Sequence, residues 1–96
     1  QQFQIHSSQE LQAHYYKKEF DKMIAMEAEA VAAQTTDEGR SDVYYWIGVA
    51  YNEKIEGSAN AEYVKNQAVS AFRKVTAGRN VEGAKAAIAA LTAPAK

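Results

Sequence analysis

The segment Tyr44-Tyr45-Trp46-Ile47-Gly48-Val49-Ala50-Tyr51 decides the fold that we expect for this chain. Its apolar positions repeat at helical spacing along one face, through Tyr44, Ile47, Gly48 and Tyr51. Because glycine has no Cβ atom, the backbone at Gly48 leaves room for a neighbouring helix. The segment therefore predicts a helix that packs closely against a partner.

A second stripe with helical spacing follows in residues 68–75. Its apolar positions are Ala68, Phe72 and Val75, with Ala71 beside them. Since Ala68 is small, we expect the two helices to pack as a tight antiparallel hairpin, with Gly48 against Ala68. Tyr51 and Phe72 are then expected to fill the space above and below that contact.

The composition of the 96 residues fits a single all-α domain. A hydrophobic content of 47% with 24% charged residues belongs to an ordinary globular chain with one modest core. The single proline is Pro94, so no ring interrupts helix formation between Ser7 and Leu91. No apolar run reaches the roughly 20 residues that span a bilayer, and the lack of cysteine excludes disulfides and thiolate metal sites.

The net charge of −1 argues against a dedicated nucleic-acid-binding protein, so we expect no nucleic-acid partner. The charge is nevertheless unevenly distributed. Residues 1–60 carry five Lys or Arg and ten Asp or Glu, a sum of −5, whereas residues 61–96 carry six against two, a sum of +4. This asymmetry could support head-to-tail association or an oriented partner, although solvated helix faces also vary in sign without any function.

Five helices are expected, with short connections that favour antiparallel neighbours. Their approximate bounds are residues 7–18, 20–33, 42–56, 61–77 and 80–92. Ser7 followed by Glu10 is a capping-box pattern, so residues 1–6 are expected to be an extended lead-in. Residues 35–41 form the clearest linker, and the N-cap candidates within it are Thr36, Asp37 and Ser41.

Helical spacing also predicts the remaining core residues. They are Leu11 and Tyr15 in the first helix, Phe20, Met23, Ile24, Ala30 and Val31 in the second, and Val81, Ala84, Ile88 and Leu91 in the fifth. Trp46 lies on a third stripe of its helix, so we expect it to pack on the first or second helix. Gly57 and Gly78 are suitable stops for the third and fourth helices.

The order of side chains in residues 41–77 resembles the tetratricopeptide repeat, a helix-turn-helix unit. The shared positions are an aromatic residue, an aliphatic residue followed by glycine, and a tyrosine in one helix, then a small and an aromatic residue in the next. They are filled here by Tyr44, Ile47, Gly48, Tyr51, Ala68 and Phe72. The interval between the two groups is longer than the family's by about two helical turns, which predicts a longer hairpin.

This resemblance implies a right-handed array of antiparallel helical hairpins. Residues 7–34 would form a first, degenerate hairpin, residues 41–77 the second hairpin, and residues 80–92 a capping helix. The first helix of each pair in such arrays lines a concave groove, which would present Gln9, Ala13, Tyr16, Lys17, Tyr45, Val49, Asn52 and Glu53. Tyr16 and Tyr45 would fit equally well as packing residues between helices.

The resemblance therefore implies a non-enzymatic module that binds another protein or a peptide, serves as a scaffold, or self-associates. One alternative is a small helical bundle that binds a hydrophobic or anionic small molecule in a cavity lined by Met23, Met26 and tyrosines. Another is a structural component of a cell envelope.

Residue patterns for catalysis, cofactors and metals are missing from the sequence. There is no cysteine, no nucleophile turn and no glycine-rich phosphate loop, so an enzyme is not expected. His6, Glu10 and His14 are four residues apart, but the outer two would be separated by about 12 Å on one helix. The Ser7 cap would also leave His6 outside the helix, so no metal site is expected.

Five basic residues near the carboxyl end could meet phosphate or anionic lipid. They are Lys65, Arg73, Lys74, Arg79 and Lys85. Because they are spread over two helices without interleaved exposed aromatic residues, we expect them mainly to keep this end solvated. The chain begins at Gln1 without methionine, which fits cleavage of a signal peptide from an exported bacterial protein, or excision from a larger protein.

Overall fold

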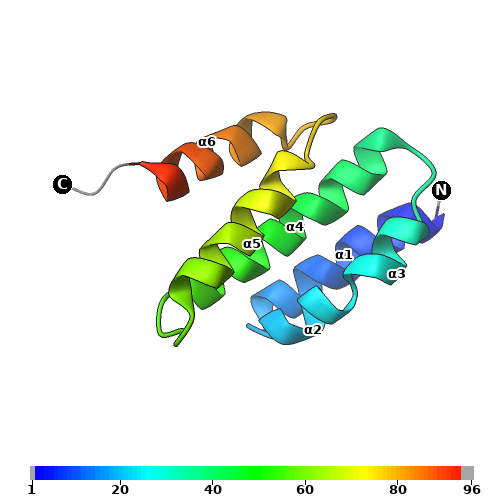
Figure 1. Cartoon of the computed structure of the whole chain (residues 1–96). Helices are drawn as coiled ribbons and strands as arrows, with labels where there is room; N and C mark the ends of the chain where they lie inside the picture. Colours follow the sequence, from blue (N-terminus) through cyan, green and yellow to red (C-terminus); the bar gives the residue numbers. More distant parts are fainter. Residues whose placement is uncertain (1, 94–96) are drawn as a thin grey trace.

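The computed structural model describes the backbone of residues 2–93 and the side chains of residues 7–93. All regular structure in that part of the chain is helical, which confirms the all-α prediction. The helices are α1 (Gln2–Tyr16), α2 (Phe20–Ala25), α3 (Glu27–Ala32), α4 (Asp37–Ile55), α5 (Ala61–Arg73) and α6 (Val81–Thr92) (Figure 1).

The long helix α4 is the centre of the molecule. It contacts α1, α2 and α3 and packs most extensively on α5, which in turn carries α6 (Figure 1). The result is a stack of helices measuring 45 × 25 × 19 Å. The expected hairpin between residues 41–77 is therefore present as the α4–α5 pair.

Gly48 and the ring of Phe72 pack closely against each other in this hairpin. A Cβ atom placed on Gly48 would lie 2.8 Å from Cδ1 and Cε1 of Phe72 and 2.9 Å from its Cζ. The expected close packing at Gly48 of α4 is confirmed, but the side chain that packs there differs from our expectation. The Phe72 ring lies directly on Gly48 and does not fill a space beside a Gly48–Ala68 contact.

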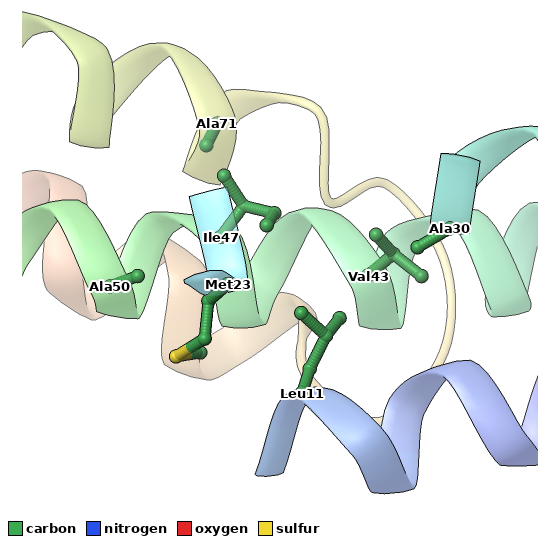
Figure 2. Close-up of a cluster of buried hydrophobic side chains, with 7 residues drawn as sticks. All are labelled: Leu11, Met23, Ala30, Val43, Ile47, Ala50 and Ala71. Carbon is green, nitrogen blue, oxygen red and sulfur yellow. The ribbon is translucent and has the colours of Figure 1, made fainter. Parts of the chain in front are cut away.

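The first core cluster joins α4 to the first three helices. Figure 2 shows its buried members, with Leu11 rising from α1 toward the side chains of α4, and Ala71 approaching from α5. They are Leu11, Met23, Ala30, Val43, Ile47, Ala50 and Ala71. Tyr15, Phe20, Ile24, Val31 and Trp46 pack around them, as expected from their spacing.

A second core cluster joins α4 and α5 to α6. Its buried members are Ala68, Phe72, Val75 and Ala84. Val81, Ile88 and Leu91 of α6 pack against it, which confirms the stripe predicted for the last helix. The helix α6 therefore covers apolar surface that the hairpin alone would leave exposed to water.

The beginning of the chain differs from the expectation. The backbone is already helical at Gln2, so the extended lead-in over residues 1–6 and the N-cap at Ser7 are both wrong. Because a helical turn precedes Ser7, the backbone amides after Ser7 can bond to carbonyls of that turn, and a side-chain cap at Ser7 is unnecessary. The backbone at His6 also lies within α1, contrary to the placement outside the helix, and its side chain is outside the described residues.

The second expected helix is divided into α2 and α3 at Met26. The interruption is slight, because the Met26 amide still donates to the Lys22 carbonyl (3.2 Å) and the Ala30 amide to the Met26 carbonyl (2.8 Å). The turn that precedes α2 contains no glycine. Lys18 has a φ of 61° there. It therefore adopts the left-handed backbone conformation that glycine usually adopts in such turns.

The helix α4 begins at Asp37, within the segment expected to be a linker. Thr36 is its N-cap, and the Thr36 Oγ1 accepts a hydrogen bond from the Gly39 amide at 3.0 Å. Ser41, the competing candidate, is instead a buried residue of the helix with 1% of its surface exposed. Its Oγ accepts from the amides of Thr76 (3.1 Å) and Ala77 (3.2 Å).

This hydroxyl also explains why α5 ends at Arg73 and not at Ala77 as expected. Amides that bond to Ser41 cannot continue the helical ladder, so the chain leaves α5 and places Val75 in the second core cluster. Gly57 and Gly78 have φ of 84° and 91°. Both therefore adopt the left-handed conformation. Gly57 directly follows the C-cap Glu56 of α4, as expected, whereas Gly78 lies in the loop after α5 and does not end that helix, so its expected role as a helix stop is wrong.

Ser41→Ala is expected to lower the free energy of unfolding by about 1–3 kcal/mol, because two amides lose their shared acceptor. Urea denaturation followed by circular dichroism measures this change. Ser70→Ala, at an exposed position of α5, is the matched control and is expected to change stability by less than about 0.5 kcal/mol. Equal stability of the two variants would contradict a structural role for the Ser41 hydroxyl.

Candidate binding face

The eight residues expected in a groove lie on α1 and α4 and in the turn after α1, and we call the surface they define the binding face. Six of them are exposed to solvent: Gln9, Ala13, Tyr16, Lys17, Asn52 and Glu53. The other two, Tyr45 and Val49, are half-buried. The face is therefore polar and accessible at its edges and apolar where it approaches α6.

Tyr45 is held by contacts with three neighbours. Its ring centroid lies 5.8 Å from that of Phe72 and 5.6 Å from that of Trp46. A Cβ atom placed on Gly83 of α6 would lie 3.4 Å from Tyr45 Cε1. Tyr45 and Val49 both pack against the second core cluster, so the packing role is the one that the contacts support for Tyr45.

A row of aromatic rings crosses from α1 to α4. Tyr16 and Tyr15 are 5.6 Å apart between ring centroids, and Tyr15 and Trp46 are 5.4 Å apart. Trp46 packs on α1 as the sequence predicted, and it continues the row to Tyr45. The row ends at Tyr16, whose surface is 74% exposed.

An open pocket of about 230 Å³ lies where this row reaches the surface. It is lined by Tyr15, Tyr16, Lys18, Phe20 and Glu53. The structure thus brings together Tyr16 and Glu53, two of the expected groove residues. Lys18 and Phe20 were not predicted as site residues, although the turn between the first two helices was an available signal for them.

A second, polar pocket of about 390 Å³ lies at the other end of α1 and α4. Its lining comprises Ser8, Gln9, Gln12, Gln34, Thr36, Glu38, Gly39, Asp42 and Arg79. Gln9 is the one expected groove residue among them. The lining comes from α1, from residues 34–42 and from Arg79, which are far apart in the chain, so no local sequence pattern could have revealed this pocket.

The turn beside the aromatic pocket is fixed by a hydrogen bond between two side chains. Nδ1 of His14 lies 2.6 Å from Oε1 of Glu19. This hydrogen bond, together with the nearby Lys22, lowers the pKa of the Glu19 carboxyl below its ordinary value. His14 and Glu19 therefore stabilise the reversal from α1 to α2, which holds Tyr15 and Phe20 in place.

Other kinds of site find no support in the part of the chain that the structure describes. No group of three or more His, Asp or Glu side chains there gathers closely enough to hold a metal ion. None of the described helices has the length and apolar character needed to cross a membrane. Comparison with known proteins found no matching family model, no matching curated protein and no matching solved structure.

Proposed function

We propose that this protein is a non-enzymatic recognition module, similar to a tetratricopeptide-repeat domain, that binds a peptide segment of another protein across the binding face. The observation that carries the proposal is the exposure of Tyr16, at 74%, at the end of the aromatic row. An isolated exposed tyrosine is ordinary, but this ring packs on Tyr15, which packs in turn on Trp46.

A supported aromatic ring is well suited to recognition. Tyrosine offers a large contact area with few rotatable bonds, so little conformational entropy is lost when a partner covers it. Glu53 and Lys18 border the same pocket and can bond to the backbone or side chains of the ligand. Asn52, exposed on the next position of α4, adds an amide donor and acceptor.

The alternative of a bundle enclosing a small molecule has less support. It requires Met23 and Met26 to line a cavity. Met23 is completely buried in the first core cluster, between α4 and the first two helices, so its side chain already fills that space. A recognition role on the surface needs no such cavity.

Selection of peptides from a random displayed library on the immobilised protein tests the proposal. We expect Tyr16→Ala combined with Asn52→Ala to weaken binding of the selected peptides at least about tenfold, since aromatic anchors dominate such interfaces. The thermal melting curve is expected to stay nearly unchanged because both side chains are exposed.

Tyr63→Ala is the matched control, because Tyr63 is 62% exposed on α5, a helix that contributes no residue to the binding face. It should leave the affinity for the selected peptides unchanged. The assignment of the binding face would be contradicted if no peptide could be selected. It would also be contradicted if the Tyr63 variant lost as much peptide affinity as the combined Tyr16 and Asn52 variant.

A further inference from the structure

A third open pocket, of about 670 Å³, lies between α5 and the end of α6, on a surface separate from the binding face. Its lining residues are Glu62, Lys65, Asn66, Val69, Ser70, Arg73, Lys74, Leu91 and Thr92. The apolar surface comes mainly from the half-buried Leu91 of α6 and to a small extent from Val69 of α5, which is 7% exposed. We call this surface the basic groove.

The charge of the basic groove is predominantly positive. It contains Lys65, Arg73 and Lys74 against one carboxylate, that of Glu62. Lys65 is partly neutralised, since its Nζ lies 3.3 Å from Oε1 of Glu62. Arg73 forms no ion pair with any residue that the structure describes, so its guanidinium is open to a carboxylate from outside.

Lys74 is positioned by an aromatic ring at the edge of the groove. Its Nζ lies 5.1 Å from the ring centroid of Tyr44, within the range of a cation–π contact. This contact fixes a second positive charge next to Arg73. The groove therefore offers strong positive potential at one end and a weaker, partly paired charge at the other.

The spacing along α5 defines what could bind there. Lys65, Val69 and Arg73 are successive positions four residues apart on one face of the helix. At about 1.5 Å of rise per residue, the two basic positions are about 12 Å apart, with the apolar position midway. In an extended peptide, residues four apart are separated by about 13 Å and, with the residue midway between them, point to the same side.

We propose that the basic groove binds an extended acidic segment of a partner protein, with two carboxylates four residues apart and an apolar side chain midway between them. The carboxylates bond to Arg73 and Lys65, and the apolar side chain contacts Val69 and Leu91. Binding at Lys65 exchanges the weak internal pair with Glu62 for an intermolecular one. The charge of the groove and the match of spacings carry this proposal independently of the binding face.

Fluorescence anisotropy with synthetic peptides tests the proposal. The probe is a labelled peptide Gly-Asp-Ser-Leu-Ser-Glu-Gly with blocked ends, and the comparison peptide is Gly-Asp-Leu-Glu-Ser-Ser-Gly, which has the same composition and closer carboxylates. We expect at least about tenfold tighter binding of the first. Its affinity is expected to fall steeply between about 0.1 M and about 1 M salt.

Lys65→Glu combined with Arg73→Glu is expected to abolish binding of the probe peptide, and melting curves check that the variant remains folded. Lys22→Glu combined with Lys85→Glu changes the net charge equally at exposed positions outside both the groove and the binding face, and it should preserve the difference between the two peptides. Equal binding of both peptides, or no binding of either, overturns the proposal. Loss of binding through Tyr16→Ala and not through the groove variant also overturns it, by assigning the peptide to the binding face.

Discussion

Gly48→Leu is expected to separate α4 from α5 and to lower the free energy of unfolding by about 3 kcal/mol or more. Even a Cβ atom at this position would meet the Phe72 ring at 2.8 Å. The ring cannot move aside easily, because Phe72 is 98% buried, with only 2% of its surface exposed. Urea denaturation measures the loss, and loss of the folded state in the absence of denaturant would agree with the same prediction.

A double-mutant cycle isolates this contact. Gly48→Ala raises intrinsic helix stability by about 1 kcal/mol, but in the native background the clash with Phe72 should outweigh that gain. In a Phe72→Leu background the ring is gone, so Gly48→Ala is expected to become stabilising, with a coupling energy of about 1–2 kcal/mol. Additive effects of the two substitutions would show that the glycine and the ring do not share one site.

Phe72→Ala is expected to lower the free energy of unfolding by about 3–5 kcal/mol, the usual cost of removing a buried aromatic side chain. The ring contacts Gly48 and Tyr45 and belongs to the cluster that attaches α6. Since small domains are stable by only about 5–15 kcal/mol in total, this single change removes much of the margin. Chemical denaturation gives the value, and circular dichroism reports the accompanying loss of helix.

Tyr63→Ala provides the comparison for Phe72→Ala on the same helix. The Tyr63 side chain is 62% exposed, so its removal is expected to change stability by less than about 0.5 kcal/mol. A Phe72 variant that unfolds at the same urea concentration as the Tyr63 variant would contradict the burial of the Phe72 ring between α4, α5 and α6.

The candidate site could be predicted only in part, and the reason differs from residue to residue. The resemblance to tetratricopeptide repeats implied that Tyr16 and Glu53 share one groove, and the structure brings them into one pocket. The same resemblance put Tyr45 in the groove or, as an alternative, between packed helices, and it carried no information about the contact with α6 that covers this ring. The basic groove could not be predicted from the sequence for a related reason, because Leu91 and Arg73 line one groove only when α6 packs against α5.

Helix boundaries failed where a tertiary contact competed with a local signal. Ser41 has the chemistry of an N-cap, yet its hydroxyl binds the amides of Thr76 and Ala77, which follow it by more than thirty positions. Thr36 is the N-cap instead, so α4 begins at Asp37, within the segment whose composition indicated a linker. At the start of the chain, the capping-box pattern at Ser7 was overridden because the helix already extends back to Gln2.

The sequence by itself determined that this protein is all-α, because helical periodicity and side-chain size are local properties that need no knowledge of the neighbours. It also indicated that the neighbouring helix packs closely on Gly48. Only the tertiary structure decided that the Phe72 ring fills that space, which helix covers Tyr45, and which charges gather in one groove. Those features depend on contacts between residues far apart in the chain. Such contacts do not appear in the hydrophobic periodicity of the segments that make them.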